Sequence, residues 1–87
     1  MTNAELLAKV KEGNNIYGDY LDFTIQLYID EVKHYMMDAG VSEGFFSSDA
    51  CVGIVTIGVK DLYINGSLST YFHQRVNQLK YEVKANV

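Results

Sequence analysis

The sequence predicts an all-α fold, a small bundle of about four helices joined by short connections, in which the second helix is the longest. Apolar residues recur every three or four positions through most of the chain, which is the spacing of one helix face. Residues that typically begin or end helices separate these stretches. The chain has 87 residues, enough for one domain spanning residues 1–87 with a thin hydrophobic core.

The first helix is short. Thr2 is followed three residues later by Glu5, and this spacing matches a capping box at a helix N-terminus. An apolar edge that ends at Val10 follows, and Gly13 is a typical helix end. We therefore expect a helix that begins next to Thr2 and ends near Gly13.

The second helix is expected to run from Asp19, as the N-cap, to Gly40. One apolar stripe follows its length: Leu21, Ile25, Ile29, Val32, Met36 and Ala39. Phe23 and Leu27 fall on the opposite side, with Tyr20 beside them. Because a helix of a small monomer buries only one face, Tyr20, Phe23 and Leu27 are predicted to contact another protein chain.

The third helix, expected at residues 50–65, is the least certain element by propensity. Its first ten residues are mostly β-branched and are interrupted by Gly53 and Gly58, which alone favours a strand. The Ser-Ser-Asp cluster at 47–49 as an N-cap, Asn65-Gly66 as a helix end, and helical apolar spacing favour a buried helix. The two glycines would then let a neighbouring helix approach closely. Just before this segment, Phe45 and Phe46 are expected to fill a gap between helices, with an exposed contact as the alternative.

The last helix is expected to begin at Ser67 or Ser69. Its apolar stripe comprises Leu68, Phe72, Val76, Leu79 and Val83. His73, Asn77, Lys80 and Lys84 form an adjacent polar and mildly basic stripe, with Arg75 nearby. Arg75, Lys80 and Lys84 are predicted to dock against a partner protein.

Charge and cysteine content exclude several classes of protein. The net charge is −4, which argues against a strongly basic nucleic-acid binder. Residues 1–61 carry ten acidic and four basic side chains, whereas residues 62–87 carry one acidic and three basic ones. The single cysteine, Cys51, forms no intrachain disulfide and is expected to be a small buried hydrophobe. No apolar stretch reaches the ~20 residues of a membrane span, so no membrane partner is expected.

The motifs of catalysis and cofactor binding do not occur. Neither phosphate-binding glycine loop is present, and neither is the G-x-S-x-G motif of a serine nucleophile. Asp30, His34 and Asp38 share one face of the long helix at metal-ligand spacing, but a solvated face is the preferred interpretation. We therefore predict no catalytic, cofactor or metal site and no enzymatic activity.

Three segments carry a resemblance to a known family: LDFTIQLYIDEVKHYMMDAGV in the long helix, SDACVGIVTIGVKDLYING, and FHQRVNQLK. Together they resemble the head–tail connector, or head-completion adaptor, proteins of tailed bacteriophages. The resemblance implies an all-α structural protein that forms a ring of about a dozen copies. It implies the portal protein and the next head–tail joining or tail protein as partners, with genomic DNA passing through the ring without sequence-specific binding. The implied location is the head–tail junction of the virion, reached from the bacterial host cytoplasm during assembly.

A small dimeric helical regulator, such as an antitoxin, is the alternative. It would use the same two-faced long helix but would close as a two-fold dimer. No cluster of arginines on a recognition helix supports DNA reading. The phage or prophage of origin, the number of subunits, assembly without the portal, and the face that meets the portal all stay open at this point.

Overall fold

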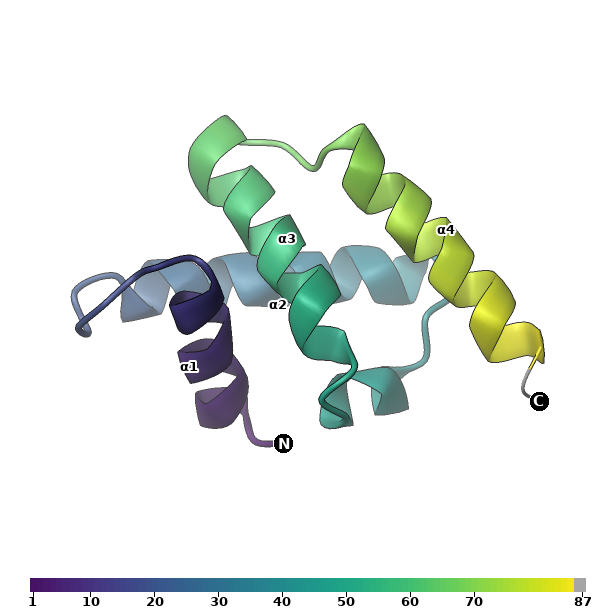
Figure 1. Ribbon diagram of the computed structural model, residues 1–87, viewed down its shortest axis with the longest axis horizontal. Helices are drawn as coiled ribbons and strands as arrows, with labels where there is room; N and C mark the ends of the chain where they lie inside the picture. The colour runs from purple at the N-terminus through teal and green to yellow at the C-terminus, as the bar shows by residue number, and fades with distance from the viewer. Residues whose placement is uncertain (86–87) are drawn as a thin grey trace.

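The computed structural model describes residues 1–85, with side chains up to residue 80. Residues 1–85 contain no strand, which confirms the predicted all-α fold. The third segment, for which a strand was the alternative, is a helix. The elements are α1 (Asn3–Gly13), α2 (Asp22–Asp38), the 3-10 helix η1 (Glu43–Ser47), α3 (Cys51–Asn65) and α4 (Thr70–Ala85), and α2 is the longest (Figure 1).

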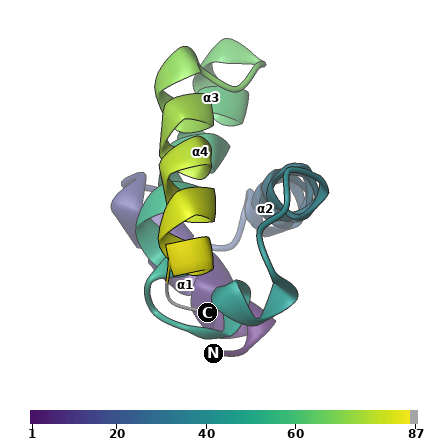
Figure 2. The ribbon, with the colours of Figure 1, turned by 90° about the vertical axis from the view of Figure 1, so that its right-hand side faces the viewer.

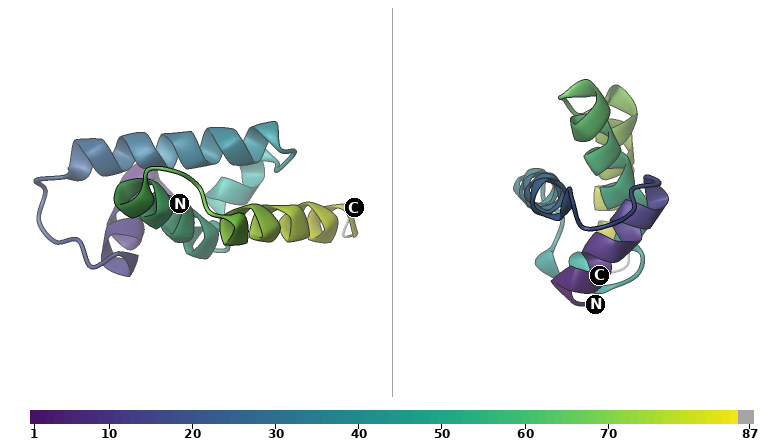
Figure 3. Two further views of the ribbon diagram at one scale, coloured as in Figure 1. Left: turned by 90° about the horizontal axis from the view of Figure 1, so that it is seen from above. Right: turned by 90° about the vertical axis from the view of Figure 1, so that its left-hand side faces the viewer.

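The helices form two layers. Helix α2 makes one layer, and α1, α3 and α4 lie together on one side of it (Figure 2 and Figure 3). Helix α3 crosses α2 and packs against both α2 and α1, so it is the centre of the fold. Helix α4 packs mainly against α3, and the loop before α2 projects at one end of the long axis.

The core lies where α2 crosses α3. The buried residues of α2 are Ile25, Ile29, Val32 and Met36, four of the six members of the predicted stripe; the other two, Leu21 and Ala39, are half-buried. Val55 and Val59 of α3 are fully buried against them. The remaining buried hydrophobic residues are Leu6, Val10, Val41, Phe46, Cys51, Ile54, Leu62, Phe72 and Val76.

Gly58 explains how α3 approaches its neighbours so closely. A Cβ atom built at Gly58 would lie 2.8 Å from Cγ2 of Val32 and 2.9 Å from Cε2 of Phe72. The predicted role of glycine in close helix packing is therefore confirmed at Gly58. It is wrong at Gly53, which is exposed and where an added Cβ atom would have no neighbouring atom within 4 Å.

Several predicted helix ends are confirmed. Thr2 and Glu5 form the complete capping box of α1. Gly66 ends α3 in the left-handed conformation, with φ of 76°. Ser69 begins α4, because its hydroxyl oxygen accepts the backbone N–H of Phe72.

Two predicted N-caps are wrong. Helix α2 begins at Asp22 rather than Asp19, because the ammonium group of Lys11 binds both the Gly18 carbonyl and the Asp22 carboxylate and holds the preceding chain in a loop. The Ser-Ser-Asp cluster does not cap α3 through a side chain. The Ser48 hydroxyl instead donates to the Phe45 carbonyl, which closes η1.

The two phenylalanines of η1 fill the space between helices, as predicted. Phe46 is buried, Phe45 is half-buried, and their rings meet edge to face at 5.6 Å. Cys51 is fully buried, also as predicted, and its sulfur lies 3.7 Å from the Phe46 carbonyl oxygen. The contacts among Phe45, Phe46 and Cys51 hold η1 against the start of α3.

Candidate protein interface

The first candidate site is an apolar surface on the side of α2 that faces away from the core. Phe23 is 77% exposed and Leu27 is 52% exposed, although both are large hydrophobic side chains. The loop before α2 extends this surface with Tyr17 and Tyr20, of which Tyr20 is 92% exposed. We call these four residues, Tyr17, Tyr20, Phe23 and Leu27, the outer α2 surface. Tyr20, Phe23 and Leu27 therefore lie where the sequence placed them, outside the core of the subunit.

The border of the outer α2 surface is acidic. Asp30 and Glu31 follow Leu27 by three and four residues, so they lie one helical turn beyond it. Both are exposed, and among the described side chains neither forms a salt bridge. Asp19 adds a third exposed carboxylate between the two tyrosines of the loop. Asp30 accepts one hydrogen bond, from the side chain of Gln26 at 3.0 Å.

A second apolar surface lies at the turn between α3 and α4. Tyr63 and Ile64 occupy the last turn of α3, and Tyr71 occupies the first turn of α4. All three are exposed, Ile64 by 63%. We call Tyr63, Ile64 and Tyr71 the turn surface. In Figure 1 this turn lies at the top of the molecule, away from the end of α2 that carries the first surface.

The border of the turn surface is basic. The guanidinium group of Arg75 lies over the Tyr71 ring, 5.8 Å from its centroid, and donates a hydrogen bond to the Tyr71 hydroxyl at 2.9 Å. Lys60 is exposed one turn before Tyr63 and Ile64. The neighbouring acidic residue, Asp61, is already engaged, because its carboxylate accepts both the backbone N–H and the hydroxyl of Ser69.

The sequence did not predict the turn surface. Tyr63 keeps the helical spacing of the apolar residues of α3, and Tyr71 is next to Phe72 of the α4 stripe, so the sequence pattern favours core or rim positions for both. Both are exposed. Helix α3 crosses α2 at Gly58, so the last turn of α3, which carries Tyr63, extends beyond the crossing (Figure 1). The usable signal was Asn65-Gly66, which ends the helix directly after Tyr63 and Ile64, so that Leu62 is the last buried residue of α3.

Two of the three predicted docking residues of α4, Arg75 and Lys80, lie on different sides of the helix. Arg75 and Lys80 differ by about 140° around the helix axis, and Arg75 belongs to the turn surface. Lys80 is half-buried. A methyl group at Gly40 would lie 3.4 Å from the Cε atom of Lys80, so the Lys80 side chain passes close to the C-terminal end of α2. The Lys84 side chain lies outside the described residues. His73 is not free either, since its Nδ1 atom and the Tyr35 hydroxyl share a hydrogen bond between α4 and α2.

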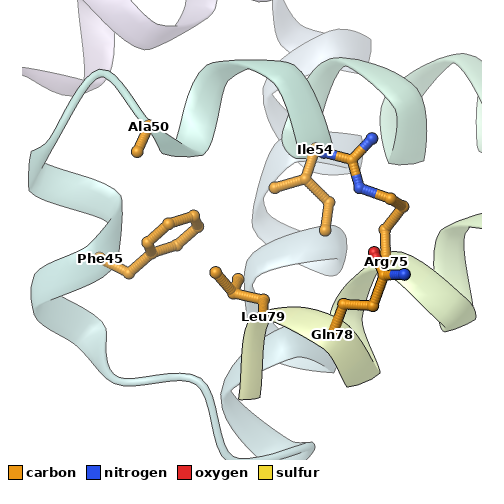
Figure 4. Close-up of a pocket in the computed structure, with 6 residues that line it drawn as sticks. All are labelled: Phe45, Ala50, Ile54, Arg75, Gln78 and Leu79. Atoms are coloured by element: carbon orange, nitrogen blue, oxygen red, sulfur yellow. The ribbon is translucent and has the colours of Figure 1, made fainter. Parts of the chain in front are cut away.

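Open pockets lie on both sides of η1 in the described part of the chain. One, of about 390 Å³, lies between η1, α3 and α4 and is lined by Phe45, Ala50, Ile54, Arg75, Gln78 and Leu79. In Figure 4 the guanidinium group of Arg75 reaches from α4 toward α3 above this pocket, while Phe45 and Leu79 point into it. The other, of about 470 Å³, lies beside η1 and includes Lys33, His34 and Glu43. Neither contains a nucleophile held by a base.

Asp30, His34 and Asp38 of α2, which have the spacing of metal ligands, do not converge on a common point. Among the residues that the structure describes, no group of three or more His, Cys, Asp or Glu side chains comes close enough together to hold a metal ion. Asp30, His34 and Asp38 are exposed on the outer side of α2, as the solvated-face interpretation predicts. We also find no candidate for a membrane span among the described helices.

Comparison with other proteins does not assign a family. No family model, no curated protein and no solved structure matches this chain.

Proposed function

We propose that this chain is a structural subunit of the head–tail connector of a tailed bacteriophage, with no catalytic role. Copies of it would form a ring of about a dozen subunits between the portal protein and the next head–tail joining or tail protein. Genomic DNA would pass through the ring without sequence-specific binding. The proposed location is the head–tail junction of the virion, after assembly in the host cytoplasm.

The structural observation that supports this proposal is the outer α2 surface, which adds to the resemblance of three sequence segments to head–tail connector proteins. Aromatic side chains are enriched where protein chains meet, and contiguous exposed apolar patches typically mark interaction sites. Tyr20, Phe23 and Leu27 project from the side of α2 opposite its buried stripe, and the described part of the subunit leaves each of them at least half exposed. A subunit whose longest helix is apolar on two sides fits lateral packing between copies.

The charge distribution also supports the proposal. The chain carries a net charge of −4, and exposed carboxylates lie along the outer side of α2. A channel through which DNA must pass should not bind the phosphates tightly, because each phosphate that basic residues neutralise adds to the affinity of the protein for DNA. Lys80, near the C-terminal end of α2, and Lys84 stay the proposed contacts to the portal or the adjacent ring.

Deletion of the gene from the phage or prophage that encodes it tests this function. We expect electron micrographs of the lysate to show separate heads and tails, and expression of the wild-type protein in trans to restore joined particles. Phe23→Asp with Leu27→Asp should fail to restore them. The control Asn3→Asp with Ser42→Asp adds the same two charges at exposed polar positions and should restore them. Normal particles after deletion would overturn the proposal.

A further inference from the structure

The two apolar surfaces of one subunit carry opposite charges at their borders. Carboxylates of Asp19, Asp30 and Glu31 surround the outer α2 surface, whereas Lys60 and Arg75 border the turn surface. Complementary charge of this kind steers association and fixes the register of a contact. A contact of the outer α2 surface with itself would instead bring carboxylates together.

We propose that the outer α2 surface of one copy docks onto the turn surface of the next copy, in a head-to-tail contact between identical chains. The inference rests on the proposed function, because it names the two surfaces that would meet between neighbours in the ring. A contact between different surfaces of the same chain is heterologous: it repeats from subunit to subunit and gives a ring where the rotation between neighbours closes, and an open filament where it does not. It therefore differs from the two-fold contact of a dimeric regulator.

The size of the outer α2 surface fits this role. A fully covered aromatic side chain buries about 150–250 Å², so the four exposed residues of this surface can bury on the order of 500 Å². This is a large part of the about 800 Å² that each partner contributes to a standard interface. Because both surfaces are rich in tyrosine, aromatic rings would pack on both sides of the contact.

The positions of the two surfaces permit repeated contact. Phe23 and Leu27 lie opposite the stripe of α2 that packs on α3, so the outer α2 surface faces away from α3. The turn surface lies at the far end of α3, beyond its crossing with α2 (Figure 1). One subunit can therefore hold two neighbours at once, one on each surface.

A matched pair of variants tests the pairing. Phe23 is the second residue of α2, and Tyr71 is the second residue of α4. Both are exposed, and a carboxylate in the first turn of a helix is favoured by the helix dipole. Phe23→Asp and Tyr71→Asp should therefore both fold, as circular dichroism melting would show, while each removes one of the two surfaces.

Sedimentation velocity of the purified full-length chain gives the readout. We expect wild-type protein at millimolar concentration to form species larger than a dimer, and each variant alone to be a monomer. A 1:1 mixture should give dimers and nothing larger, because the turn surface of Phe23→Asp can accept the α2 surface of Tyr71→Asp. Three results would overturn the pairing: monomeric wild-type protein, a monomeric mixture, or normal assembly of Tyr71→Asp alone.

Charge exchange provides a second readout. Glu31→Lys and Lys60→Glu should each weaken wild-type assembly by about two- to fivefold, the range expected for an exposed ion pair, and the chain carrying both changes should recover. No recovery would overturn the placement of Glu31 of one copy next to Lys60 of the next. The outcome is separate from the phage experiment: dimers in the mixture with normal phage after gene deletion would reject the function alone. Unjoined heads and tails with a monomeric mixture would reject the pairing alone.

Discussion

Gly58 of α3 lies directly against Val32 of α2, so closely that a Cβ atom on Gly58 would come within 2.8 Å of Cγ2 of Val32. The ring of Phe72 of α4 lies against the same point, 2.9 Å from where that Cβ atom would be. Three helices therefore meet at one backbone position without a side chain. This crossing sets where α3 extends beyond the core, and so it positions the turn surface.

Gly58→Ala is expected to destabilise the fold by about 1–2 kcal/mol. Inserting a methyl group into a packed core costs about 1–3 kcal/mol, and replacing a helical glycine by alanine returns at most about 1 kcal/mol. The expected result is a lower midpoint in urea unfolding. Gly53→Ala is the matched control, since it makes the same change in the same helix at an open position. It should be neutral or stabilising by about 0.5 kcal/mol. Equal stability of the two variants would contradict the packing role of Gly58.

Gly66→Ala should cost about 1–2 kcal/mol, because Gly66 ends α3 with φ of 76° and residues with a Cβ atom are strained there. Thermal unfolding would measure the loss. Gly44→Ala is a suitable control, since Gly44 has no positive φ and a methyl group there meets only Ser42 Oγ, at 3.9 Å. An unchanged melting temperature for Gly66→Ala would show that α3 can end without the left-handed turn.

How much the sequence could predict differs between the core and the surfaces. The stripe around Ile25 and Val32, the capping box of α1 and the glycine end of α3 follow from local rules, and the structure confirms them. The true start of α2 at Asp22 and the exposure of Tyr63 depend on contacts between residues distant in the sequence. The contact of Lys11 with Asp22 fixes the start of α2, and the crossing at Gly58 leaves Tyr63 exposed. No periodicity within one helix contains that information.

Cys51 should react slowly with iodoacetamide in the folded protein. Burial raises the pKa of the Cys51 thiol above its ordinary value of 9.0, and the reactive species is the thiolate. Because the folded pKa is the higher one, the thiol stabilises the folded state below about pH 9, and this contribution is lost as the pH rises toward the folded pKa. Mass spectrometry at about pH 8.5 should show little alkylation until urea unfolds the chain. Cys51→Ala should lose less stability between about pH 8 and 10 than the wild type. Rapid alkylation of the folded protein would contradict burial of the thiol.

Lys11→Met should loosen the loop that carries Tyr17 and Tyr20. The Lys11 ammonium group bridges the Gly18 carbonyl and the Asp22 carboxylate, and methionine keeps most of the apolar stem while removing both bonds. We expect a loss of about 1 kcal/mol in unfolding free energy, because charged hydrogen bonds that are partly exposed contribute about that much. Hydrogen exchange should rise between residues 17 and 22 and stay unchanged in α3.

The same variant connects the loop to association. A mobile loop must be ordered when it docks, and that ordering costs free energy at the interface. Lys11→Met should therefore weaken self-association, whereas Lys9→Met, which removes only the exposed pair with Asp49 at 3.2 Å, should leave it unchanged. Sedimentation velocity at matched concentrations compares the two. If both variants assemble as the wild type does, the loop tyrosines are not part of the contact and the outer α2 surface reduces to Phe23 and Leu27.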